Sequence, residues 1–266
     1  MAEVAWSEVT AAAFFDLDKT IIAKSSTLAF TKPLYKGGFL TRRALARAAM
    51  AQAYYHSFGA DHDQMERIKD ELATMTKGWS REEVVSLVEE TVDAVVAPLA
   101  YSEALALIDG HRRAGRKVVV ISAGPEEIVR PLCRHLGIED VIATRTEVGP
   151  GGRYTGTIEF YAYGPAKAEA MVEMAGSEGI DLSDSYAYSD SVTDLPMLEA
   201  VGHPVVVNPD GELEKIASER GWEIRHFESA VTIRDRMPVK TMSGVAVVGG
   251  VAAATYWLIK MRKKRG

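Results

Sequence analysis

The sequence predicts an α/β protein with a parallel-sheet core, a helical insertion near the N-terminus and a hydrophobic C-terminal helix. From residue 98 onward, short apolar runs suited to buried strands alternate with helical segments, which favours a parallel sheet covered on both faces. Thr27 to Val96 contains almost only helical patterns, which predicts the insertion. Thr241 to Ile259 carries no charged residue, which sets the C-terminal segment apart.

The composition excludes several classes of protein. The chain has 266 residues, 47% of them hydrophobic and 26% charged, which is typical of a folded globular protein and not of a disordered or fibrous one. The net charge of -6, and a main body without a basic, aromatic stripe, predict no nucleic-acid partner. The single cysteine, Cys133, lies in a helical apolar pattern and is expected in the core. Glu3 and Glu8 argue against a signal peptide, so we expect a cytoplasmic catalytic part.

The first strand and the insertion follow each other directly. Ala11 to Leu17 is a short apolar run that predicts a buried strand. Arg42 to Phe58 is rich in good helix formers, and Gly59 is expected to end that helix before Asp61 caps the next one. Ser80-Arg81-Glu82-Glu83 resembles a capping box at the start of a further helix.

The rest of the core is predicted from alternating strand and helix patterns. Glycines 115 and 137 are expected to end two of the helices, and residues 149–152 resemble the turn of a hairpin. The predicted helices are Tyr101 to Ala114, Glu126 to Leu136 and Pro165 to Glu178, and the predicted strands are Lys117 to Ser122, Val141 to Thr144, Tyr186 to Ser189 and Val205 to Val207.

The C-terminal segment favours membrane association. Its 19 uncharged residues, Thr241 to Ile259, would span about 28 Å as a helix, close to the roughly 30 Å of bilayer hydrocarbon. Tyr256 and Trp257 near one end suit the membrane interface. A basic tail follows from Lys260 to Arg265, and the sequence leaves open whether the helix spans the bilayer or lies on its surface. The alternative is a buried or surface helix rich in Gly and Ala.

Two aspartates, Asp16 and Asp18, follow the first predicted strand in the pattern Asp-x-Asp-x-Thr. Ligands of parallel α/β sheets bind at the carboxyl ends of the strands. Two carboxylates at such a point can serve as metal ligand, nucleophile or general acid and base. Short acidic turns are common, however, so this pattern alone does not identify a catalytic site.

Three later positions have the same relation to the predicted strands and helices. Ser122 and the following Ala123 end a strand and could cradle a phosphate or cap a helix. Lys167 lies in the first turn of a helix, where a cation is disfavoured unless an anion accompanies it. Asp190 and Asp194 follow the strand Tyr186 to Ser189 and could also be helix caps.

Taken in order, these positions resemble the four motifs of the haloacid dehalogenase (HAD) superfamily. The matching segments are Phe14 to Thr20, Val119 to Ser122, Lys167 and Ser189 to Asp194. The resemblance covers about residues 10–228 and extends to the subfamily, IB, that contains phosphoserine phosphatase. It implies a Rossmann-like core (8–22 and 98–236) and a helical type-1 cap (23–97). The uncharged C-terminal segment adds an expected membrane-anchor helix with a basic tail (237–266). One departure is Ser189, where the fourth motif usually has glycine.

The resemblance also implies a mechanism and a cofactor. Asp16 would attack phosphorus to form an aspartyl-phosphate, and Asp18 would protonate the leaving oxygen and then activate water. Ser122, Ala123 and Lys167 would bind the phosphate. Mg²⁺ would be held at a metal site formed by Asp16, the backbone carbonyl of Asp18 and Asp190, which Asp194 would support through water or by orienting Lys167.

The expected function is therefore Mg²⁺-dependent hydrolysis of a small phosphomonoester, one related to membranes or lipids if the C-terminal segment reaches a bilayer. A phosphoserine phosphatase is the first alternative, but Ser25 stands where that enzyme has the glutamate that holds the substrate amine, and Arg67 is a weak stand-in for its substrate arginine. A phosphotransferase is the second alternative, and a non-catalytic, membrane-tethered phosphate-binding module is the third.

Overall fold

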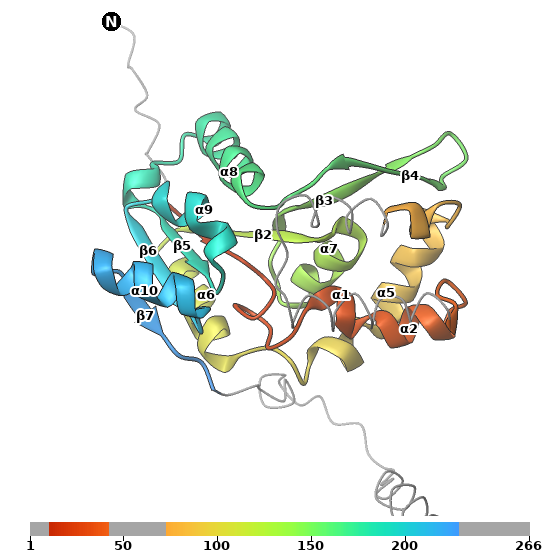
Figure 1. Cartoon of the computed structure of the whole chain (residues 1–266), viewed down its shortest axis with the longest axis horizontal. Coiled ribbons are helices and arrows are strands. Elements are labelled where there is room, and N and C mark those ends of the chain that lie inside the picture. The colour runs from red at the N-terminus through yellow and green to blue at the C-terminus, as the bar shows by residue number, and fades with distance from the viewer. Residues whose placement is uncertain (1–10, 43–72, 229–266) are drawn as a thin grey trace, which may run out of the picture. The chain divides into compact units, whose positions relative to one another are not determined.

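The computed structural model describes residues 11–42 and 73–228, and within them the chain forms a seven-stranded sheet (Figure 1). The strand order is β4-β3-β2-β1-β5-β6-β7. Every neighbouring pair is parallel except β3 and β4, which form an antiparallel hairpin. The strands are β1 (Ala12–Phe15), β2 (Lys117–Pro125), β3 (Asp140–Val148), β4 (Tyr154–Phe160), β5 (Tyr186–Ser189), β6 (His203–Val207) and β7 (Glu223–Arg225). The predicted parallel α/β core is confirmed.

The two faces of the sheet are covered by different helices. Ala13 and Phe15 of β1 point into one hydrophobic core, while Ala12 and Phe14 point into the other, as the alternation of side chains along a strand requires. The first core is shared with α5 (Arg81–Val96), α6 (Ser102–Arg113) and α7 (Glu126–His135), and the second with α8 (Pro165–Glu178), α9 (Leu195–Glu199) and α10 (Gly211–Arg220).

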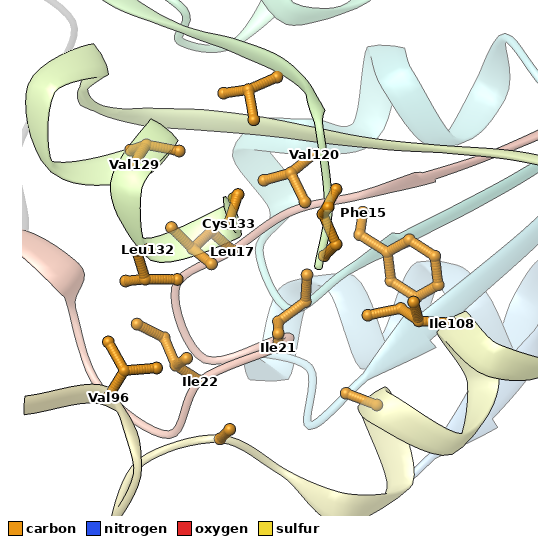
Figure 2. Close-up of a cluster of buried hydrophobic side chains, with 14 of the residues drawn as sticks. Phe15, Leu17, Ile21, Ile22, Val96, Ile108, Val120, Val129, Leu132 and Cys133 are labelled. Carbon is orange, nitrogen blue, oxygen red and sulfur yellow. The ribbon is translucent and has the colours of Figure 1, made fainter. Parts of the chain in front are cut away.

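Figure 2 shows how side chains of the first core pack around the last residue of β1 and the residues that follow it. Leu17 lies beside Leu132 and Cys133 of α7, Phe15 lies next to Ile108 of α6, and all five side chains are at most 1% exposed. Burial of this kind stabilises a fold by about 1.5–3 kcal/mol per large apolar side chain. Cys133 is buried, which confirms the expectation of a core cysteine, and this burial raises the pKa of its thiol.

Most predicted helix and strand limits agree with the structure to within a few residues. Helix α8 has the predicted bounds, and Ser80 caps α5 by accepting a hydrogen bond from the backbone N–H of Glu83 at 3.3 Å. The turn at residues 149–152 joins β3 and β4 as predicted. Strand β7 was not predicted, because its three residues have no apolar run. The remaining elements are the short helices α1 (Ser26–Ala29) and α2 (Thr31–Lys36) and the 3-10 turns η1 (Leu182–Asp184) and η2 (Val192–Asp194).

Some predictions fall on residues outside the described ranges. The predicted helix from Arg42 to Phe58 lies outside them except for Arg42 itself. The predicted helix cap at Asp61, the possible substrate arginine Arg67 and the C-terminal segment Thr241 to Ile259 also lie outside them. Among the residues that the structure does describe, no helix is both long enough and apolar enough to cross a bilayer. The predicted division into core, cap and anchor stays a prediction.

Candidate active site

The predicted acidic residues lie at the carboxyl ends of two neighbouring strands. Strands β1 and β5 are parallel, with Phe15 opposite Tyr188. The pairing continues one residue further, because the backbone N–H of Asp16 donates to the carbonyl oxygen of Tyr188 at 2.9 Å. Asp190 follows β5 directly, so the sheet itself brings the first and fourth motifs to one edge.

A buried lysine joins these two motifs. Lys167 lies in the first turn of α8, and its Nζ is 2.6 Å from Oδ1 of Asp16 and 2.8 Å from Oδ2 of Asp194. The three side chains are 4%, 8% and 3% exposed. Ser189 Oγ donates a further hydrogen bond to the same Asp194 oxygen at 2.8 Å. The ammonium group is therefore held between two carboxylates in a nearly water-free environment, where charges interact strongly.

Burial dominates the protonation equilibria of this site. Desolvation raises the pKa of Asp16 to about 8; Lys167 opposes the shift, and Asp194 and Asp190 add to it. Desolvation also raises the pKa of Asp190 to about 6. For Lys167, desolvation favours the neutral amine, but the charges of Asp16 and Asp194 outweigh it and the net effect is a raised pKa. The lysine therefore stays cationic, while the acidic cluster needs further positive charge to ionise fully.

Asp18 has a hydrogen-bond partner of its own. Its Oδ1 accepts a hydrogen bond at 2.8 Å from the backbone N–H of Ser26, the first residue of α1. Burial raises the pKa of Asp18, and the Ser26 N–H opposes that shift. A carboxyl group with a raised pKa, two residues from Asp16, is suited to donate and accept a proton.

Two other residues near the site were not singled out from the sequence. Lys19, which directly follows Asp18, has a φ of 64° and places its Nζ 3.4 Å from Oδ2 of Asp190. A left-handed conformation is uncommon for lysine, and no sequence signal reveals it. Thr144 in the middle of β3 donates to the carbonyl oxygen of Ala123 at 2.8 Å and accepts from the N–H of Ala162 at 3.2 Å. It joins the segment before α8 to the last residues of β2.

Ser122 was expected at the end of a strand, but β2 continues to Pro125, with an irregular pairing to β3 between these two residues. Ser122 is 1% exposed. Its Oγ accepts the backbone N–H of Gly124 at 3.1 Å, which leaves the hydroxyl hydrogen available for a ligand. A Cβ at Gly124 would lie 2.9 Å from Val129, 3.1 Å from the Ser26 hydroxyl and 3.3 Å from the Ser122 hydroxyl. Only glycine at position 124 therefore lets this part of β2 pass so close to Ser26 and Ser122.

The donor set fits a hard cation with few protein ligands. Each of the four predicted aspartates already has a partner: Asp16 and Asp194 contact Lys167, Asp190 contacts Lys19, and Asp18 accepts the N–H of Ser26. Within the described ranges, no group of three or more carboxylate, imidazole or thiol side chains is placed to hold a metal ion. The ligands that the family resemblance implies are Asp16, Asp190 and the backbone carbonyl of Asp18. Two carboxylates and a backbone carbonyl nevertheless match Mg²⁺, which takes oxygen ligands and usually keeps several waters.

Comparison with known proteins places the chain in a family. Residues 13–199 match the family model of haloacid dehalogenase-like hydrolases. A Mycobacterium tuberculosis H37Rv protein named "Probable phosphatase Rv3661" is 51% identical over 94% of this chain and 89% of its own length. Phosphoserine phosphatase SerB1 of the same strain is 35% identical (93% of this chain, 80% of the relative), and a histidinol-phosphatase of Neisseria meningitidis is 34% identical (81% and 98%).

Solved structures show the same fold. A Bordetella pertussis Tohama I protein of unknown function superposes with a TM-score of 0.72 at 29% identity, over 82% of this chain and 98% of that one. A phosphoserine phosphatase holding an analogue of the phospho-aspartyl intermediate superposes with a TM-score of 0.59 at 19% identity, over 86% and 97%. The matched family model and the curated relatives together show that the chain belongs to the haloacid dehalogenase-like hydrolase family.

Proposed function

We propose that this protein hydrolyses a phosphomonoester in two steps, through a phosphoryl group carried on Asp16. The observation that supports this most directly is the buried contact of Lys167 with Asp16 at 2.6 Å. A carboxylate nucleophile must approach a phosphate dianion, and the two repel each other unless a cation lies between or beside them. Lys167 supplies that cation, and the names of the phosphatase relatives support the same reaction.

In the first step, a carboxylate oxygen of Asp16 attacks phosphorus while Asp18 gives a proton to the leaving oxygen. In the second step, Asp18 takes a proton from water, which attacks the phosphorus of the acyl phosphate and regenerates Asp16. Ser122 and the N–H groups of the loop after it would bind the phosphoryl oxygens, and Lys167 would balance their charge.

Mg²⁺ fits the same proposal. Asp16, Asp190 and the backbone carbonyl of Asp18 would hold it, and when bound it supplies positive charge that neutralises the phosphoryl oxygens. Asp194 has another role in this scheme, because its carboxylate contacts Lys167 and Ser189. We assign it to the orientation of Lys167.

The substrate is less constrained than the chemistry. Ser25, which stands where phosphoserine phosphatases have a glutamate, is the N-cap of α1, and its hydroxyl accepts the N–H of Leu28 at 3.5 Å. A serine in this position gives no carboxylate to bind a substrate amine, which disfavours phosphoserine. Two relatives of nearly equal identity carry the names of different substrates, so similarity does not choose between them.

We further propose that the enzyme acts at a membrane, on a lipid-related phosphomonoester. The support is the uncharged segment Thr241 to Ile259 and the basic tail after it. Flotation with vesicles of neutral and of anionic lipids tests this for the full chain and for a chain ending at Lys240. The full chain should float and the shortened chain should not; equal behaviour of the two chains would refute the attachment.

The central experiment is phosphate release by the purified full chain over a panel of phosphomonoesters that includes phosphoserine, histidinol phosphate and lysophosphatidate. Each assay is run with and without Mg²⁺, and with Asp16→Asn as the control for contaminating enzymes. Release that requires both Mg²⁺ and Asp16 supports the proposal. Wild-type release that persists unchanged in Asp16→Asn would refute the role of Asp16 as nucleophile.

Two rival functions give different results in that experiment. A phosphotransferase would release little phosphate until an acceptor alcohol is added, after which the phosphoryl group would appear on the acceptor. A non-catalytic phosphate-binding module would bind phosphate and release none from any ester. The complete set of Asp16, Asp18 and Lys167, in hydrogen-bonded and buried positions, favours an enzyme over the binding module.

A further inference from the structure

Ser189 is the one residue of the four motifs that departs from the family pattern, and its hydroxyl is fully buried at the end of β5. The backbone N–H of Ser191 donates to Ser189 Oγ at 3.2 Å. Because an N–H can only donate, the hydroxyl accepts this bond and its own hydrogen is free for another partner. That partner is Oδ2 of Asp194, at 2.8 Å. The direction of the second hydrogen bond is therefore fixed.

The hydrogen bond from Ser189 to Asp194 is the first of three contacts that link Ser189 to Asp16. Oδ2 of Asp194 also accepts from Nζ of Lys167 at 2.8 Å, and Nζ reaches Oδ1 of Asp16 at 2.6 Å. The other oxygen of Asp194, Oδ1, is buried and has no hydrogen-bond partner among the described residues. One oxygen of Asp194 thus takes both donors, and the two donors together determine how the carboxylate is rotated.

Without the hydroxyl, only the lysine would orient this carboxylate. Rotation about the bond between Cβ and Cγ could then present either oxygen to Lys167, and the position of Nζ relative to Asp16 would be less well defined. The charge of the site would not change, because serine is neutral. The loss would concern orientation, and small errors of position at a reacting centre reduce rates strongly.

We propose that Ser189 is a positioning residue for the phosphoryl-transfer reaction: its hydroxyl locks Asp194 so that Lys167 is held against Asp16. This inference rests on the proposed function, because the reaction that it serves is phosphoryl transfer at Asp16. A glycine, which the family usually has at this position, lacks the hydroxyl and cannot make this bond. In this chain the serine therefore supplies an additional constraint on the lysine.

The chain offers a matched control in Ser185, which immediately precedes the same strand. Its hydroxyl is also fully buried, accepts the backbone N–H of Ala12 at 2.9 Å and donates to the carbonyl oxygen of Asp181 at 2.6 Å. Ser185→Ala and Ser189→Ala each remove one buried hydroxyl with one accepted and one donated hydrogen bond. Only the second touches the contacts of Lys167.

The test is a pair of double-mutant cycles that combine each serine variant with Asp194→Asn. Turnover is measured at saturating substrate and Mg²⁺, at a temperature at which every variant is folded, and urea unfolding is measured on the same proteins. We expect Ser189→Ala to lower kcat about tenfold or more, as for a lost hydrogen bond to a charged group, and Ser185→Ala to leave kcat within about twofold of wild type. In the Asp194→Asn background, Ser189→Ala should change kcat by less than about twofold.

The two measurements separate failure of this inference from failure of the proposed function. If Ser189→Ala keeps the wild-type kcat, or if its effect is undiminished in Asp194→Asn, the positioning role is refuted. If the wild-type protein releases no phosphate, the proposed function fails. The double-mutant cycle of urea unfolding then tests only the contact between Ser189 and Asp194. Ser189→Ala should then shift the urea midpoint less in Asp194→Asn than in wild type, whereas shifts that simply add would refute the contact.

Discussion

Lys167 contacts two buried carboxylates, and replacing it with methionine removes this positive charge. Among the described residues, no other group neutralises both carboxylates. Methionine is of similar length and needs no hydrogen bond, so the variant changes charge more than packing. The ammonium group lies 2.6 Å from Asp16 and 2.8 Å from Asp194, and its side chain is 4% exposed. Both carboxylates would remain buried after the change, without their shared counter-ion.

The size of the effect follows from that burial. Removing one partner of a buried ion pair typically costs about 3–5 kcal/mol, because the remaining charge is left uncompensated. Asp16 can escape part of this cost by taking a proton, since desolvation already raises its pKa to about 8 with the lysine present. We therefore expect a loss of about 3 kcal/mol in the free energy of unfolding at about pH 8, and a fall of about 10³ in kcat from lost charge stabilisation.

The loss of stability should depend on pH, and its sign can be stated. Without Lys167 the pKa of Asp16 in the folded protein rises further above the unfolded value, so the folded state binds more protons than the unfolded state between the two values. Stability then falls as pH rises through this window. Because the wild-type Asp16 loses its proton near pH 8 and the variant's Asp16 only at higher pH, the variant should be closer to wild type at about pH 5 than at about pH 9.

Lys117 provides the control for this experiment. Its Nζ also lies between two carboxylates, 2.9 Å from Asp140 and 2.6 Å from Glu178, but its side chain is 25% exposed. Lys117→Met should cost no more than about 1 kcal/mol, as a surface ion pair does, and leave activity unchanged. Urea unfolding at both pH values and steady-state phosphate release measure both variants. If Lys167→Met matched Lys117→Met in stability and rate, the assigned role of the buried lysine would be wrong.

Two further predictions concern the metal and the packing. Asp16 and Asp190 must be ionised to bind Mg²⁺, and burial raises their pKa values to about 8 and about 6. Mg²⁺ affinity should therefore rise about tenfold per pH unit between about pH 6 and pH 8, more steeply below about pH 6, and level off above about pH 8, which calorimetric titration can measure; an affinity independent of pH would contradict these shifts. A Cβ at Gly202 would lie 1.7 Å from the carbonyl oxygen of Ser183, so Gly202→Ala should cost about 1–3 kcal/mol of stability. Gly176→Ala in α8, where nothing lies within 4 Å of the added carbon, should stabilise the protein by up to about 1 kcal/mol, and thermal unfolding compares the two.

Much of the fold was accessible from the sequence, because local patterns specify buried strands and helix ends. The apolar run before Asp16 and the β-branched run that ends at Ser122 predict buried strands, and Gly115 and Gly137 follow the ends of two helices, where their backbone preference suits them. Strand β7 has no such pattern: Glu223, Ile224 and Arg225 join the sheet by backbone pairing with β6, which sequence periodicity does not record.

The candidate site shows the same division between what the sequence predicts and what the tertiary structure adds. The sequence by itself predicted which residues would do the chemistry, since the order of Asp16, Ser122, Lys167 and Asp190 along alternating strands and helices is specific. It did not determine which carboxylate contacts which partner. Asp18 and Asp194 have the same side chain, but one accepts the N–H of Ser26 and the other accepts Lys167 and Ser189.

Those pairings belong to the tertiary structure, because they join residues far apart in the chain. Lys167 and Asp16 are separated by 151 positions, and only the parallel pairing of β1 with β5 and the packing of α8 over the sheet bring them to 2.6 Å. The raised pKa of Asp16 likewise follows from burial and from the neighbours that the fold assembles. Composition and spacing specify the groups, whereas their protonation and charge balance depend on the low-dielectric environment that forms only when the two cores close around them.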